Sequence, residues 1–197
     1  MELYNKLSAK QRAALIKKAG GKRLTLSFYK YHIIKNCELF RDHLYINWSE
    51  LDVLGRIYVA KEGINAQLSV ASENFEKFKK TIDQITFLNN VRLNIAIEHD
   101  NFSFLKLKIK LRKNIVADGL DSLNIDLNNN GEHLNAKDFN KMIESHETLL
   151  VDMRNHYESE IGHFQGAILP DVDSFRESLP IIEKTFEEHK KSKNIVM

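Results

Sequence analysis

The sequence predicts an α+β protein in which a sandwich of βαββαβ order is followed by the first part of an α/β domain. Strand-like and helix-like patterns alternate in that order between residues 22 and 114, and a stretch rich in Asn, Asp and Gly follows. A shorter series of helix and strand patterns fills the rest. We therefore expect an N-terminal helix (1–21), a sandwich domain (22–114), a linker (115–134) and a partial α/β domain (135–197).

The first predicted elements are a basic helix, a strand and a second helix. Ser8 and Gln11 have the spacing of a capping box, and Gly20 ends the helix that they begin. The segment LTLSFYKYH (24–32) is rich in Thr, Phe and Tyr, which favours a strand. Asn36 then caps a helix that we expect to run to about Leu51.

A hairpin and one more α/β step complete the sandwich. GRIYVAKEGINAQLSV (55–70) predicts two strands joined around residues 61–63, where Gly63 serves the turn. Ser72 begins a helix that carries Phe75, Phe78, Ile82 and Ile85 on one face, and VRLNIAIE (91–98) alternates like a half-buried strand. This order predicts the split ferredoxin-like sandwich, a four-stranded antiparallel sheet with both helices on one face.

The segment FLKLKIKLR (104–112) alternates four apolar residues with Lys106, Lys108, Lys110 and Arg112. As a strand it places the four cations in one row, about 7 Å apart. Such a row suits the backbone phosphates of RNA. It also suits an edge strand that uses lysines against edge-to-edge aggregation, and both roles are compatible.

The last third of the chain predicts an α/β unit. Asn135 caps a helix, TLLVD (148–152) is a short buried strand, and AIL (167–169) is a candidate for another. An amphipathic helix spans 173–190, with a kink or break at Pro180 because proline removes a backbone donor. KNIVM (193–197) begins a new strand, at which the sequence stops.

The charge is divided unevenly along the chain, although the net charge is only +2. Residues 1–131 hold 21 Lys and Arg against 14 Asp and Glu, whereas residues 132–197 hold 8 against 13. A basic first part is consistent with contact to a polyanion such as RNA.

Composition excludes several classes of protein. No apolar run is long enough to span a membrane, and the polar start MELYNKLSAK is unlike a signal peptide. The single cysteine, Cys37, excludes an internal disulfide and a multi-cysteine metal site. We therefore expect a cytoplasmic protein with no metal site.

The stretch VDMRNHYESEIGHFQGAILP (151–170) carries the pattern D-x-R-x-x-x-E-x-x-x-G-H-x-x-G-A. This pattern resembles the first signature of rhodanese-like domains. Together with SFYKYHII, GRIYVAKEGINAQLSV, VRLNIAI and LKIKLRKNIVADG, it resembles the rhodanese-related tRNA uridine hydroxylases from about Leu24 to Met197.

The resemblance implies a ferredoxin-like domain followed by a rhodanese-like domain. It also implies an oxidoreductase that installs the 5-hydroxyl group on the wobble uridine of tRNA, with molecular oxygen as co-substrate and no bound cofactor. The family's essential cysteine lies in a loop after the strand that reads KNIVM here, so it is expected just after Met197. This chain then corresponds to an N-terminal portion, and we expect the isolated chain to be inactive.

Asp152, Arg154, Glu158 and His163 are the residues expected to support that active site. Each also has a structural interpretation: Asp152 and Arg154 as an ion pair that organises a loop, and His163 as a hydrogen-bonded histidine without metal-ligand neighbours. Cys37 lies at the start of a predicted helix without a nucleophile's surroundings, so we interpret it as a packing residue.

The central motif of the family matches Glu62, Gly63 and Asn65, which are expected to face a cleft between the domains or to form a self-capped hairpin turn. The expected partner is the anticodon arm of tRNA. Its predicted contacts are basic side chains and two tyrosines for base stacking: Arg56, Lys61, Lys106, Lys108, Lys110, Arg112, Lys113, Tyr29 and Tyr31.

Two other functions remain open on the sequence alone. A rhodanese-type sulfurtransferase would carry a persulfide on the cysteine that follows KNIVM, although the N-terminal motifs argue against it. A non-enzymatic RNA-binding or protein-binding module would use the same residues without chemistry. A cysteine-containing, glycine-rich loop encoded after Met197 would favour an enzyme.

Overall fold

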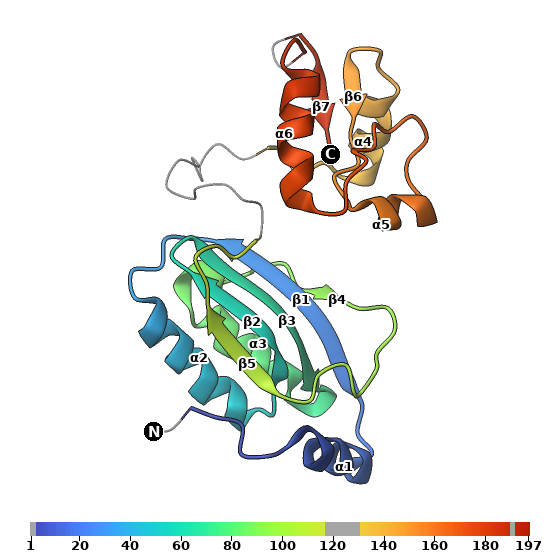
Figure 1. Cartoon of the computed structure of the whole chain (residues 1–197). Helices are drawn as coiled ribbons and strands as arrows, with labels where there is room; N and C mark the ends of the chain where they lie inside the picture. The colour runs from blue at the N-terminus through green and yellow to red at the C-terminus, as the bar shows by residue number, and fades with distance from the viewer. Residues whose placement is uncertain (1–2, 117–130, 190–191) are drawn as a thin grey trace. The chain divides into compact units, whose positions relative to one another are not determined.

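The computed structural model describes residues 3–116, 131–189 and 192–197. The chain forms two compact units, unit 1 (Met1–Val116) and unit 2 (Ala117–Met197), which are drawn in Figure 1. Most of the predicted linker, residues 117–130, lies outside the described residues. In the described parts of both units, every helix is too short or too polar to cross a membrane.

Unit 1 begins with helix α1 (Ala9–Ala19). The Ser8 hydroxyl accepts a hydrogen bond from the Gln11 amide, and the Gln11 side chain accepts one from the Ser8 amide, so the predicted capping box is confirmed. The helix ends at Gly20, whose φ of 66° is accessible to glycine at little cost.

The sheet of unit 1 has five strands in the order β4-β1-β3-β2-β5. They are β1 (Arg23–Tyr31), β2 (Leu54–Ala60), β3 (Gly63–Ala71), β4 (Asn94–Ile95) and β5 (Leu107–Leu111). Neighbours among β1 to β4 are antiparallel, in the order expected of the predicted sandwich, and β5 joins β2 in parallel at one edge. The edge position predicted for the lysine-rich strand is confirmed.

Two α-helices cover one face of this sheet (Figure 1). They are α2 (Cys37–Glu50), capped by Asn36 as predicted, and α3 (Phe75–Asp83). Trp48 of α2 contacts Phe78 of α3 at 5.4 Å between ring centroids, and both rings are fully buried with the apolar side chains of β1, β2 and β3. Burial of these large rings supplies much of the driving force for folding of unit 1.

The structure corrects two details of the predicted sandwich. The strand predicted over 91–98 is reduced to the two exposed residues of β4, and Ile97 is fully exposed. β4 pairs with β1 at only two positions, which explains why alternation in its sequence does not produce alternating burial. The helix predicted from Ser72 starts as the 3₁₀ turn η1 (Ser72–Asn74) and, after α3, a second 3₁₀ turn η2 (Thr86–Leu88) follows Ile85.

The described part of unit 2 contains helices α4 (Ala136–Ile143), α5 (His156–Ile161) and α6 (Phe175–Phe186) and strands β6 (Thr148–Leu150) and β7 (Asn194–Val196). The two strands pair in parallel, and one bridge joins Val151 to Ile168. The candidate strand at 167–169 is therefore a single bridge. A small apolar cluster of Val151, Ile182 and Phe186 holds α6 against the strands.

Of the kink or break predicted at Pro180, the break is wrong, because α6 continues through this residue. Proline removes one backbone hydrogen bond, but the helix is held from both sides of the proline by buried Ser178 and Ile182. The Ser178 hydroxyl also donates a 2.7 Å hydrogen bond to the carbonyl oxygen of Phe175. Packing of one face therefore outweighs the lost backbone bond.

Candidate functional site

The face of the unit 1 sheet opposite α2 and α3 carries aromatic, amide and basic side chains. We call it the open face and define it by residues of β1, β3, β2 and β5: Ser27, Tyr29, Gln67, Arg56, Tyr58, Lys108 and Lys110. Tyr29, Arg56, Gln67 and both lysines are exposed, whereas the core residues between them in sequence point to the helices. Alternation along each strand therefore separates a buried face from a face that solvent reaches.

Strand register aligns these side chains in two rows across the sheet. In one row, Ser27 is opposite Gln67, Gln67 is opposite Arg56, and Arg56 is opposite Lys108. In the other row, Tyr29 and Tyr58 flank Asn65, and Tyr58 is opposite Lys110. Tyr29 therefore lies on β1, whereas Tyr58 lies on β2 beside the positive charges of β2 and β5.

The structure gathers some of the predicted RNA contacts and separates others. Arg56, Lys108, Lys110 and Tyr29 share the open face, and Tyr31 lies beside Tyr29 with ring centroids 6.3 Å apart. Three other predicted cations lie outside these rows: Lys61 in the hairpin turn, half-buried Lys106 before β5, and Lys113 after it.

Tyr58 and Gln67 of the open face were absent from the predicted contacts. The Arg112 guanidinium lies over the Tyr58 ring at 5.2 Å from its centroid, a cation–π contact. Tyr58 follows Arg56 by two residues in a strand, so period-two alternation was the signal that places both on one face.

Glu62 and Asn65 hold the chain where it leaves β5. Glu62 is only 6% exposed, and its Oε1 accepts a 2.6 Å hydrogen bond from the amide of Ile115. The Asn65 amide donates to the carbonyl oxygen of the same residue at 3.2 Å. Both side chains are thus engaged inside unit 1, and their contacts fix residue 115 against the start of β3.

Gly63 has a different role from the predicted one. It is the first residue of β3 rather than a turn residue, and a Cβ at this position would lie 2.1 Å from the carbonyl oxygen of Lys30. Its φ of 151° is also rarely adopted by other residues. Close approach of two backbones, between β1 and β3, therefore requires glycine here.

A cavity of about 800 Å³ lies in unit 2, next to the carboxyl ends of β6 and β7. Its lining includes apolar Leu150, Met153 and Phe164 and the polar side chains of Asp152, Arg154 and His163. Three of the four residues predicted to support an active site therefore meet at one cavity.

Asp152 and Arg154 form a bidentate ion pair at this cavity. Arg154 Nε and Nη2 donate to the two carboxylate oxygens of Asp152, and Nη2 also donates to the carbonyl oxygen of Gly162 at 2.5 Å. The Asp152 side chain is 9% exposed, against 47% for Arg154. The hydrogen bonds from Arg154 hold the pKa of Asp152 below its usual range, so the carboxylate is ionised at neutral pH. The pair ties the end of β6 to the loop that follows α5.

Glu158 and His163 make local structural contacts. Glu158 Oε2 accepts a hydrogen bond from the amide of Asn155, completing a capping box at the start of α5. His163 Nδ1 lies 2.9 Å from the carbonyl oxygen of Ser159, so a proton on that nitrogen is donated to α5. His163 also contributes to the lining of the cavity.

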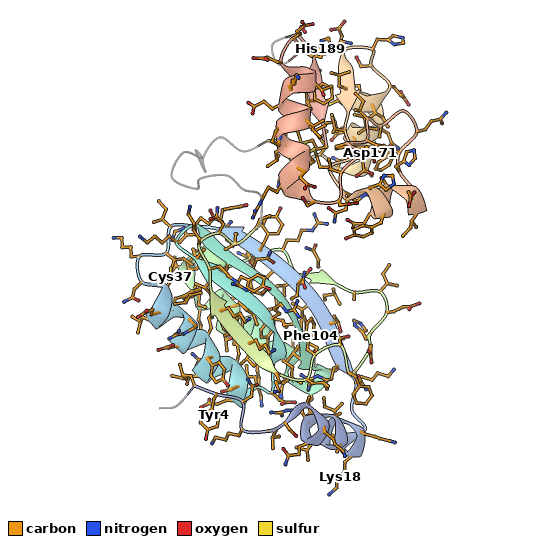
Figure 2. All side chains as sticks on the ribbon, viewed as in Figure 1. Tyr4, Lys18, Cys37, Phe104, Asp171 and His189 are labelled. Carbon is orange, nitrogen blue, oxygen red and sulfur yellow. The ribbon has the colours of Figure 1, made fainter. Side chains whose placement is uncertain are left out.

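Cys37 lies at the first position of α2 (Figure 2), in contact with the unit 1 core. Its thiol donates weakly to the carbonyl oxygen of Ile34 at 3.6 Å. Burial raises the pKa of the thiol and outweighs the opposing effect of Lys61, which makes the thiolate scarce at neutral pH. Across residues 3–116, 131–189 and 192–197, no group of three His, Cys, Asp or Glu side chains is arranged to hold a metal ion.

Comparison with known families identifies the class of unit 1. Residues 23–115 match the family described as "UPF0176 acylphosphatase like domain". The match covers the sheet, both covering helices and the residue that Glu62 and Asn65 hold.

Curated relatives extend the match into unit 2. The chain is 52% identical over 160 residues to a tRNA uridine(34) hydroxylase of Leptospira interrogans, covering 81% of this chain and 44% of that protein. It is 45% identical over 196 residues to the protein of the same name from Photorhabdus laumondii, covering 99% of this chain and 55% of that one. It is 46% identical over 196 residues to the protein of the same name from Yersinia enterocolitica, covering 99% of this chain and 56% of that one.

Nearly the whole chain is therefore similar to proteins named tRNA uridine(34) hydroxylase. It spans about half the length of the curated relatives that it matches.

Proposed function

We propose that the protein containing this chain hydroxylates carbon 5 of the uridine at position 34 of tRNA. The observation that carries the proposal is the 45–46% identity, over 99% of the chain, to proteins named tRNA uridine(34) hydroxylase. A sulfurtransferase would be expected to share only the unit 2 motif, whereas this similarity includes the whole of unit 1. Molecular oxygen would be the co-substrate, without a bound cofactor, and the reaction would take place in the cytoplasm.

Each unit has a part in this proposal. Unit 1 would contact the anticodon arm, because its sheet presents cations and aromatic rings to solvent. Unit 2 would be the first part of a rhodanese-like domain, and its cavity would lie beside the reactive centre. Asp152, Arg154, Glu158 and His163 would shape that centre, since their hydrogen bonds hold the segment between β6 and the end of α5.

The reactive thiol would not be Cys37. It is the only cysteine of the chain, it packs on the core of unit 1, and burial raises its pKa. A protein of residues 1–197 alone would therefore bind RNA without hydroxylating it.

Deletion of the encoding gene tests the proposal. We expect 5-hydroxyuridine and its derivatives at position 34 to disappear from tRNA digests analysed by mass spectrometry, and to return when the complete gene is supplied. Residues 1–197 supplied alone should restore nothing. Unchanged hydroxylation after deletion, in cells without a second hydroxylation pathway, would contradict the proposed function.

A further inference from the structure

We propose that the open face of unit 1 binds unpaired RNA nucleotides, with bases stacked on Tyr29 and Tyr58 and phosphates paired with Arg56, Lys108 and Lys110. The proposal deepens the proposed function, on which its choice of RNA rests.

The spacing of the two tyrosines suits stacking of separate bases. Tyr29 of β1 and Tyr58 of β2 are both opposite Asn65 of β3, so they lie two strands apart, or about 10 Å. Tyr29 is 53% exposed, and it makes an edge contact with Tyr31 that leaves much of its ring open. The exposed ring of Tyr29 offers a stacking face to splayed, unpaired bases, whereas bases inside a duplex are already stacked. Tyr58 is half-buried, and a base stacks on it by displacing the Arg112 guanidinium that lies over its ring.

Charge on this face complements a phosphate backbone. Arg56 is opposite Lys108, and Lys110 lies two residues further along β5, so three cations form a compact group beside the tyrosines. None of the open-face residues is acidic, and Glu62, in the nearby hairpin turn, is buried against Ile115. A strand of RNA with bases on Tyr29 and Tyr58 can therefore place its phosphates over Arg56 of β2 and the two lysines of β5.

The two ends of the open face are closed by other parts of unit 1. At one end, Arg23 donates to Asp52 and to the carbonyl oxygen of Ser69, and Arg12 of α1 pairs with the same aspartate. At the other end, Asn65 and Glu62 hold Ile115. The row of Ser27, Gln67, Arg56 and Lys108 lies between these contacts, and Ile115 lies against Asn65 in the row of the tyrosines, which leaves room for a few nucleotides of a loop rather than for a long duplex.

Protection of a sheet edge does not explain this surface. Lysines on β5 fit that role, but Arg56 belongs to β2, which has neighbours on both sides. The outer edge of β5 is also partly covered, because the Asn5 side chain exchanges two hydrogen bonds with the backbone of Leu107. Binding of a ligand therefore explains the aromatic and basic groups away from the edge better than edge protection does.

Binding of a short single-stranded RNA to the 197-residue chain, followed by fluorescence anisotropy, tests the stacking part. We expect Tyr29→Leu and Tyr58→Leu each to weaken binding about tenfold, and the same RNA annealed into a duplex to bind more weakly than the single strand. The matched control is Tyr157→Leu in unit 2, since Tyr157 is 57% exposed and lies outside unit 1. Circular dichroism must show equal folding of all variants.

Salt dependence tests the phosphate part. The triple variant R56Q/K108Q/K110Q should reduce the slope of log affinity against log salt by about 2, as expected for three lost single-strand phosphate contacts. The control triple K77Q/K79Q/K80Q removes equal charge from α3, on the other face of the sheet, and should leave the slope unchanged. Tighter binding of the duplex, unchanged affinity in both tyrosine variants, or equal slopes in the two triples would overturn the proposal.

These measurements do not depend on hydroxylation. If the gene deletion left tRNA hydroxylation intact while the open-face variants lost RNA binding, the proposed function would fail and the surface would stand. If hydroxylation required the gene but the variants bound RNA normally, the surface would be wrong and the proposed function would stand.

Discussion

Units 1 and 2 are held together by different kinds of contact. In unit 1, α2 and α3 bury large apolar side chains against one face of a five-stranded sheet, and the other face is left to polar and aromatic groups. In the described part of unit 2, the buried apolar cluster is small. Arg154 donates a hydrogen bond to the carbonyl oxygen of Gly162, Glu158 accepts one from the amide of Asn155, and His163 bonds to the carbonyl oxygen of Ser159, and these bonds hold the segment that follows β6. Core burial therefore sets the framework in unit 1, and polar contacts shape the candidate site in unit 2.

The largest expected effect separates the two units by core truncation. Phe78→Ala removes a fully buried ring beside Trp48 and should destabilise unit 1 by about 3–5 kcal/mol. Trp48 is the only tryptophan, so its fluorescence during urea unfolding reports unit 1 alone. The control Phe164→Ala, at a 59% exposed site in unit 2, should leave that transition in place. A shift of equal size in both variants would mean that the units do not unfold separately.

A slightly smaller effect is expected where β1 and β3 approach each other. Gly63→Ala places a Cβ against the carbonyl oxygen of Lys30 at a positive φ and should cost about 2–3 kcal/mol of unfolding free energy. Gly21→Ala is the matched control, because its Cβ would meet open space. Equal stability of the two variants, measured by the same fluorescence, would contradict the close approach.

The ion pair between Asp152 and Arg154 predicts that the local stability of unit 2 depends on pH. Hydrogen bonds from Arg154 lower the folded-state pKa of Asp152 below its unfolded value, so the stability that the ionised carboxylate contributes is present above the unfolded pKa and is lost as pH falls through the folded pKa. Near neutral pH, Asp152→Asn should accelerate amide exchange over residues 150–168 about fivefold. This difference from the wild-type chain should shrink as the pH falls below about 4. A difference independent of pH would exclude the ion pair as its cause.

A subtler change tests the geometry of the same pair. Arg154→Lys keeps the charge, but a lysine cannot span Asp152 and the carbonyl oxygen of Gly162 with a planar fork. Amide exchange over residues 162–167 should rise about twofold to fivefold by mass spectrometry. Arg176→Lys on α6, at an exposed position, serves as the control. Equal exchange in both variants would show that the fork does not order the loop.

The smallest effect is expected at the thiol. Because burial raises the pKa of Cys37, a thiol reagent at neutral pH should modify it more slowly than a free cysteine in a peptide, and Cys37→Ser should leave RNA affinity unchanged. Modification as fast as that of the peptide would contradict its burial against the core.

Much of the fold was predictable because its signals are local. Ser8, Asn36 and Asn135 cap the helices that follow them, and each lies within three residues of its hydrogen-bond partner. Pro180 misled the prediction, since the buried face of α6 outweighs one missing backbone bond.

The candidate sites were harder to predict because they depend on contacts distant in sequence. The Glu62 side chain accepts a hydrogen bond from Ile115, which is 53 residues later in the sequence. Glycine is needed at position 63 because the carbonyl oxygen of Lys30, in another strand, leaves no space for a Cβ. The alternation of β2 places Tyr58 on the same face as Arg56, but only pairing with β3 and β5 places it opposite Asn65 and Lys110. The Asp152–Arg154 pair, by contrast, is separated by two residues and was visible in its motif.

The central claim is that the open face of unit 1 binds RNA. This claim is tested most directly in cells that lack the gene. The complete gene is supplied with either R56Q/K108Q/K110Q or the control K77Q/K79Q/K80Q, and 5-hydroxyuridine at position 34 of tRNA is measured by mass spectrometry at matched protein levels. We predict a loss of about tenfold for the open-face triple and no loss for the control, because only the first removes phosphate contacts. Equal modification with both variants would contradict the claim.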